Sequence, residues 1–134
     1  MSSSHLAFIA EPPGVAPAAN YTHVVTGAGR LVQVSGQVAL DEHGEVVGEG
    51  DPLAQARQVF ANLGRCLAAA GAGFADVVKL TVFVTDIAHL AAVREARGAH
   101  LDPARLPASS AVQVVALFRP ELLMEIEALA VVAD

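Results

Sequence analysis

The chain has 134 residues, a length that suits one domain with one hydrophobic core. Its residues are 54% hydrophobic and 16% charged, yet no run reaches the roughly 18 uninterrupted apolar residues that a membrane-spanning helix needs. The formal net charge is −6, with only 8 lysines and arginines. Because nucleic-acid-binding domains normally present a basic face, this balance argues against an RNA or DNA partner.

The N-terminal part of the chain reads as an arm followed by two strands. Residues 1–20 are rich in Ser, Ala and Pro, which predicts a loosely ordered arm ahead of a single domain over residues 21–134. Residues 22–26 and 30–38 predict two strands. The glycines between them can adopt the positive φ of a tight turn, so we expect these strands to form a hairpin.

A second turn and a helix follow. Residues 41–44 predict a turn, and residues 45–47 predict a short strand. Asp51 suits the N-cap of a helix and Pro52 its first position, and the glycines after residue 70 suit its end. The buried face of this helix is predicted from apolar residues at helical spacing: Leu53, Ala56, Phe60, Leu63, Leu67 and Ala70.

The second half of the chain predicts a strand over residues 77–84, a helix over residues 88–100 with Asp86 as its cap, and two strands over residues 110–117 and 122–132. This order predicts an α+β fold in which two helices pack on one face of a mixed sheet. The other face is left uncovered, and the surplus of apolar residues predicts that subunits of a homo-oligomer pack there.

The last predicted strand carries two carboxylates within an apolar stretch. Because successive strand side chains point to opposite faces, Glu125 and Glu127 share one face, about 7 Å apart. The opposite face is apolar and consists of Met124, Ile126, Ala128, Ala130 and Val132. A carboxylate on a core strand needs a partner, a water molecule or a catalytic role. Two interpretations stay open: a solvated face with paired glutamates, or a carboxylate that belongs to a site.

Other features argue against several kinds of chemistry. The N-terminus lacks the charged and long apolar regions of a signal peptide, and the single cysteine, Cys66, cannot form an internal disulfide, so we expect a cytoplasmic protein. The five histidines show no metal-ligand spacing, and there is no phosphate-binding loop or dinucleotide fingerprint, so we expect neither metal nor cofactor. Cys66 lacks an obvious base, which favours a buried apolar role over a nucleophile.

Four segments occur in the order and spacing of one family: residues 34–38 (VSGQV), 76–86 (DVVKLTVFVTD), 106–112 (LPASSAV) and 125–128 (EIEA). On these segments the chain, from about residue 21 to residue 132, resembles the Rid family, also called the reactive intermediate deaminase or YjgF/YER057c/UK114 family. The resemblance implies a chorismate-mutase-like fold and a homotrimer with ligand clefts between its subunits.

The resemblance also implies which residues form the cleft. Tyr21 matches a tyrosine near the N-terminus, Ser35 matches the serine of a Ser-Gly-Gln strand, and Glu125 matches a catalytic glutamate that holds a water molecule. Gly36 and Ala111 are expected beside them as substrate-binding residues. In imine-hydrolysing members the water attacks the C=N carbon of a 2-imino acid and ammonia leaves, and a carboxylate suits this task because it can orient water and pass protons.

Two positions depart from the family pattern. Ser109 stands where active imine deaminases have an arginine that forms a bidentate pair with the substrate carboxylate, which a hydroxyl cannot imitate. Arg94 stands where the family has a pocket asparagine. Arg94 either supplies the missing cation from another wall or belongs to the solvated face of the second helix, and Arg105 is a weaker candidate for the same task.

These observations leave three functions open. The preferred one is a small-metabolite-binding protein of the Rid family that hydrolyses imines or enamines other than the usual short 2-imino acids. The second is a non-catalytic ligand-binding or regulatory trimer, which the serine at position 109 favours. The third is an endoribonuclease or translation inhibitor, which the charge balance disfavours.

Overall fold

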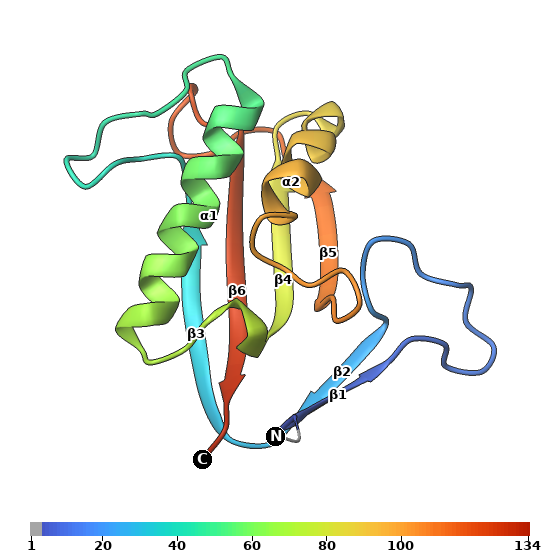
Figure 1. Cartoon of the computed structure of the whole chain (residues 1–134). Helices are drawn as coiled ribbons and strands as arrows, with labels where there is room; N and C mark the ends of the chain where they lie inside the picture. The colour runs from blue at the N-terminus through green and yellow to red at the C-terminus, as the bar shows by residue number, and fades with distance from the viewer. Residues whose placement is uncertain (1–3) are drawn as a thin grey trace.

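The computed structural model describes residues 4–134, in which two helices lie against one four-stranded sheet (Figure 1). The elements are β1 (Leu6–Ile9), β2 (Val24–Gly27), β3 (Arg30–Gln37), α1 (Pro52–Ala69), β4 (Val77–Val84), α2 (Leu90–Arg97), β5 (Ala108–Gln113) and β6 (Met124–Val132), with short 3-10 turns at Phe74–Asp76 and Ile87–His89. The sheet has the strand order β3-β6-β4-β5, in which only β4 and β5 are parallel, and β1 and β2 form a separate antiparallel pair. Both helices lie on the same side of the sheet, so the predicted α+β fold is confirmed.

Helix α1 forms where the sequence predicts it. The Asp51 carboxylate accepts a hydrogen bond from the Ala54 amide at 3.1 Å, Pro52 is the first helical residue, and Gly71 follows the helix with a φ of +74°. The predicted buried face is fully buried at Ala56, Phe60, Leu63 and Leu67, whereas Leu53 and Ala70 are half-buried. The core therefore lies between this face and the sheet.

One buried polar side chain on α1 was not predicted. The amide nitrogen of Gln55 donates to the carbonyl oxygens of Gly48 and Glu121, at 3.1 Å and 2.9 Å, and its oxygen accepts from the Leu123 amide at 2.9 Å. Burial is tolerated here because both ends of the side-chain amide are hydrogen-bonded. Gln55 thereby joins α1 to the loops that precede it and that precede β6.

The predicted hairpin between residues 22–26 and 30–38 is wrong. Strand β2 pairs with β1, with Leu6 opposite Gly27, and β3 pairs with β6. The sequence did not indicate β1, because it lies within the Ser-, Ala- and Pro-rich segment that predicted a loose arm over residues 1–20. Within the described part of that segment Leu6 is buried, and residues 1–3 lie outside the described residues.

Several element boundaries also differ from the predicted ones. Asp86 caps the 3-10 turn ahead of α2, at 2.9 Å from the Ala88 amide, so the α-helix begins later and is shorter than residues 88–100. β5 ends at Gln113 rather than residue 117, and the Gln113 side chain accepts a hydrogen bond from the Ile87 amide. β6 begins at Met124, two residues after the predicted start, and the predicted strand over residues 45–47 is reduced to a single bridge between Leu40 and Val46.

The uncovered face of the sheet carries both polar and apolar side chains. Ser35 and Glu127 are exposed, and Lys79 donates to the Ser110 hydroxyl at 2.9 Å. Leu31, an exposed apolar side chain, lies on the same strand and face as Ser35. Among the described residues, no helix combines the length and apolarity required to traverse a lipid bilayer.

Candidate functional site

A small cavity lies between α2, strands β4 and β5, and the segment before β2. We call it the α2 cavity; its volume is about 190 Å³. Four of the predicted site residues line it: Tyr21, Arg94, Ser109 and Ala111. The structure therefore brings together residues that lie up to 90 positions apart, and it places Arg94 and Ser109 at one cavity.

The strand register explains why Ser109 faces this cavity. In the parallel pair of β4 and β5, Ser109 is opposite Leu80 and Ala111 is opposite Val82. Leu80 and Val82 are buried under the helices, and paired residues point to the same face of a sheet. Ser110 points to the opposite face, where it contacts Lys79.

Ala19, Asn20 and Tyr21 form one wall of the cavity, which we call the Tyr21 wall, and hydrogen bonds hold it in place. The Thr22 amide donates to the Pro107 carbonyl oxygen at 3.1 Å, and the Arg97 guanidinium donates to the Asn20 carbonyl oxygen at 2.8 Å. Asn20 has a φ of +69°, a conformation that asparagine tolerates better than most residues. The His23 ring packs edge-on against Tyr21, with 5.2 Å between centroids.

The remaining predicted site residues, Ser35, Gly36 and Glu125, lie on β3 and β6, and we call them the β3–β6 group. A bulge in β3 lies between Val34 and Gln37, and it brings Gly36 against the Glu125 side chain. Any side chain at position 36 would overlap the Glu125 carboxylate. Ser35 lines a hollow of about 270 Å³ on the uncovered sheet face together with Glu127.

Replacing Gly36 with Ala is expected to lower the free energy of unfolding by about 1–3 kcal/mol, because the added Cβ requires the Glu125 side chain or the bulge to move. Urea denaturation measures the change. Gly73→Ala is the matched control, since no heavy atom lies within 4 Å of a Cβ built there. Equal losses in the two variants would contradict the close approach of Gly36 to Glu125.

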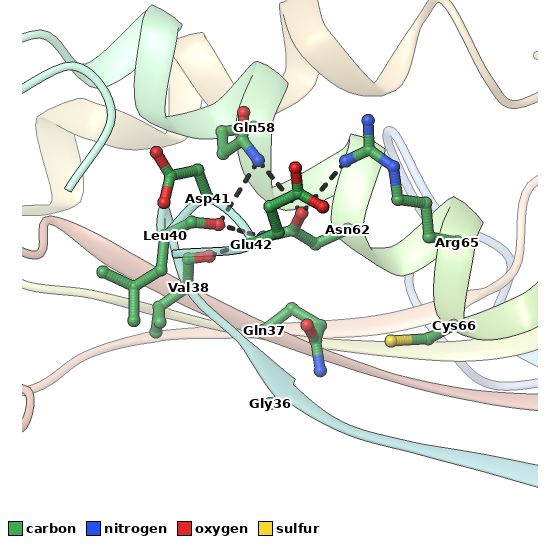
Figure 2. Close-up of a pocket in the computed structure, with 10 residues that line it drawn as sticks. All are labelled: Gly36, Gln37, Val38, Leu40, Asp41, Glu42, Gln58, Asn62, Arg65 and Cys66. Carbon is green, nitrogen blue, oxygen red and sulfur yellow. Dashed lines mark hydrogen bonds between the residues drawn. The ribbon is translucent and has the colours of Figure 1, made fainter. Parts of the chain in front are cut away.

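A polar clamp on α1 supports the backbone that follows Gly36. Figure 2 shows Gln58 and Asn62 reaching from α1 toward this segment. Both side chains line a cavity whose volume is about 570 Å³. The Asn62 amide nitrogen donates to the carbonyl oxygens of Val38 and Leu40, at 3.1 Å and 2.8 Å. Gln58 donates to the Leu40 oxygen at 3.3 Å and to the Asn62 oxygen at 3.0 Å. The only sequence signal for this clamp is two amide side chains four residues apart beside the apolar face of a helix.

Replacing Asn62 with Ala is expected to lower the free energy of unfolding by about 1–3 kcal/mol, because the Val38 and Leu40 carbonyl oxygens each lose one of their two hydrogen bonds. Chemical denaturation checks the magnitude. Arg65→Ala is the control, because Arg65 is exposed and its guanidinium reaches Asn62 only at 3.4 Å. A loss as small as that of the Arg65 variant would show that the clamp does not hold the segment.

Two other residues considered from the sequence lie elsewhere. Arg105 packs against the Phe8 ring, 4.6 Å from its centroid, and donates to the Ser4 hydroxyl at 2.7 Å. It is therefore engaged with the N-terminal strand and is not among the residues that line the α2 cavity. Cys66, for which a buried apolar role was predicted, is half-buried: it packs against the core and also lines the larger cavity beside the clamp.

The two groups of site residues occupy different parts of the sheet. Glu125 is opposite Phe83 and alternates with the buried Met124 and Ile126, so it points to the uncovered face. Ser109 points to the helix face of β5, and β3 and β5 are opposite edges of the sheet. A single chain therefore does not gather all the predicted site residues around one cavity.

Comparison with known proteins supplies the family. The family model described as Endoribonuclease L-PSP matches residues 12–132. A RutC family protein of Synechocystis is 41% identical over 117 residues, covering 87% of this chain and 88% of the relative. The mouse protein named 2-iminobutanoate/2-iminopropanoate deaminase is 40% identical over 102 residues, covering 76% of this chain and 74% of the relative.

Solved structures agree with the sequence relatives. A protein of the conserved Rid family from Yersinia pestis, described as of unknown function, superposes with a TM-score of 0.84 at 40% identity, covering 96% of this chain and all of that one. RidA from an Antarctic Psychrobacter superposes with a TM-score of 0.71 at 34% identity, covering 97% of this chain and 100% of that one. The chain belongs to the Rid family, also known as the YjgF/YER057c/UK114 family.

Proposed function

We propose that this protein binds a small metabolite in clefts between the subunits of a homotrimer. The observation that carries the proposal is the division of the site residues between the α2 cavity and the β3–β6 group. Because these groups lie toward opposite edges and faces of one sheet, a neighbouring copy is needed to place one beside the other. A closed ring of identical subunits does this at every boundary.

The chemistry that best suits the assembled cleft is hydrolysis of an imine or enamine. Glu125 orients a water molecule whose oxygen forms a bond to the C=N carbon, and the nitrogen takes up protons and leaves as ammonia. The products are a carbonyl compound and ammonia. The close approach of the Glu125 side chain to Gly36, where any larger residue would meet it, is compatible with this role. The mouse relative, a named imine deaminase, also favours it.

The substrate differs from the short 2-imino acids of the usual family enzymes. The family resemblance implies that Ser109 stands where active members have an arginine, and a serine hydroxyl cannot form a bidentate pair with a carboxylate. Loss of a charge-assisted anchor in a partly buried site costs about 2–5 kcal/mol. Without an arginine at position 109, the site therefore favours a ligand that is anchored by contacts with other residues.

A semicarbazide-trapping assay tests the proposed function. An amino-acid dehydratase generates 2-iminobutanoate, and an amino-acid oxidase generates bulkier 2-imino acids from the matching amino acids. A protein that hydrolyses the imine suppresses formation of the trapped product. We expect suppression with at least one bulky imine and little with 2-iminobutanoate.

Binding without turnover is the second candidate, and the serine at position 109 is the observation that favours it. A protein that binds 2-oxo acids in calorimetry but leaves every imine to the trap would be a ligand-binding trimer rather than a deaminase. The family model carries the description endoribonuclease, but the net charge of −6 argues against RNA as the substrate. RNA binding that weakens steeply with salt would reverse that argument.

A further inference from the structure

Helix α2 places two arginines at the α2 cavity without a carboxylate among its lining residues. Arg94 and Arg97 are three residues apart and therefore share one face of the helix. Arg97 donates one hydrogen bond to the Asn20 carbonyl oxygen. Over residues 4–134 the Arg94 guanidinium has no hydrogen bond and no ion pair, and the neighbouring Glu95 pairs with Arg57 at 3.6 Å.

The two guanidinium groups repel each other at this cavity. Burial, followed by the positive charge of Arg94, holds the pKa of Arg97 below its ordinary value. Like charges three or four residues apart destabilise a helix unless an opposite charge lies near them. An anion bound at the mouth of the cavity would offset this repulsion. Guanidinium groups suit carboxylates in particular, since the planar fork matches two carboxylate oxygens.

The floor of the same cavity is apolar. Val82 and Val93 are 5% exposed, and Ala111 and Leu90 complete this surface. Ser109 contributes a short side chain where a longer one would fill the space. The cavity thus combines a cationic mouth with an apolar floor, which suits an acid that has a hydrocarbon body.

We propose that the α2 cavity anchors the carboxylate of its ligand on Arg94 and holds a branched or aromatic side chain on Val82, Val93 and Ala111. This inference rests on the proposed function, in which the α2 cavity is part of the ligand cleft. It names the substrate class as 2-imino acids with branched or aromatic side chains. Arg97 acts as a positioning residue, because its hydrogen bond to Asn20 keeps the Tyr21 wall against α2.

Calorimetric titration with 2-oxo acids tests the anchor without any need for turnover. The panel is pyruvate, 2-oxobutanoate, 4-methyl-2-oxopentanoate and phenylpyruvate, each a stable analogue of the matching imino acid. We expect affinity to rise at least about tenfold from pyruvate to 4-methyl-2-oxopentanoate, since each buried methylene strengthens binding several-fold. Arg94→Gln is expected to weaken binding of the acids about 10- to 100-fold, and to leave binding of the corresponding neutral 2-oxo amides unchanged.

Arg65→Gln is the matched control, because it removes the same charge from an exposed arginine on α1 that does not line the α2 cavity. Equal weakening by the Arg65 and Arg94 substitutions would overturn the inference in favour of a general effect of net charge. Tighter binding of inorganic phosphate than of any 2-oxo acid would also overturn it. Glu125-dependent hydrolysis that is insensitive to Arg94 removes this inference and keeps the proposed function. Arg94-dependent binding of 2-oxo acids without hydrolysis of any imine keeps the Arg94 anchor and removes the proposed hydrolysis.

Discussion

Replacing Glu125 with Gln is expected to lower kcat for imine hydrolysis by about 10²- to 10⁴-fold, because an amide cannot accept a proton from the attacking water. The substrate is the imine on which the natural chain is fastest in the trapping assay. We expect KM to change little, since the role proposed for Glu125 is to orient the water and not to bind the acid group of the substrate. Gln is nearly isosteric with Glu, so the packing against Gly36 is kept.

Glu127→Gln is the control for this prediction. Glu127 lies two residues along the same face of β6, but it is exposed and lines the hollow on the uncovered sheet face. Removing its charge is expected to leave kcat unchanged. If the two substitutions lowered kcat equally, the effect would come from the electrostatics of the strand, and Glu125 would lose its assigned role.

Replacing Ser109 with Arg is expected to raise kcat/KM for 2-iminobutanoate by about 30- to 5000-fold, because the arginine offers a bidentate partner on β5 to the substrate carboxylate. Ser109 faces the α2 cavity and is half-buried, so the new side chain has the cavity available to it. The same substitution is expected to weaken binding of bulky acids, since the arginine fills the space beside the apolar floor. The trapping assay measures this change in specificity when 2-iminobutanoate and a bulky 2-imino acid are compared for the natural chain and the variant.

Ser109→Lys separates charge from geometry in this experiment. Lysine supplies a positive charge but not the planar fork, so a gain well below that of the arginine variant is expected. Full activity of the natural chain on 2-iminobutanoate would contradict the importance assigned to position 109.

Local sequence signals were sufficient for the elements that form the core. The Asp51-Pro52 start of α1 and the β-branched run of β4 have strong local preferences, and the structure agrees with both. The alternation along β6 correctly placed Met124 and Ile126 inside and Glu125 on the other face. These features depend on spacing within one segment, which a sequence displays directly.

Pairing between distant segments was beyond such reasoning. The glycines between β2 and β3 are compatible with a hairpin, but β2 pairs with β1, whose composition resembles an unstructured arm. The clamp formed by Asn62 depends on where the Val38–Leu40 backbone passes α1, and no local pattern reveals that. The family resemblance named the site residues, while their division into two groups became visible only from the sheet order.

The central claim is that one ligand cleft takes residues from two chains, and mixed trimers test it most directly. Glu125→Gln disables the β3–β6 group, and Ser109→Trp fills the α2 cavity; each variant alone is expected to be inactive. In trimers reassembled from equal amounts of the two variants, about one quarter of the clefts should join an intact group from each neighbour, so imine hydrolysis should return to about one quarter of the natural rate. Mixed trimers as inactive as either parent would show that each cleft belongs to a single chain.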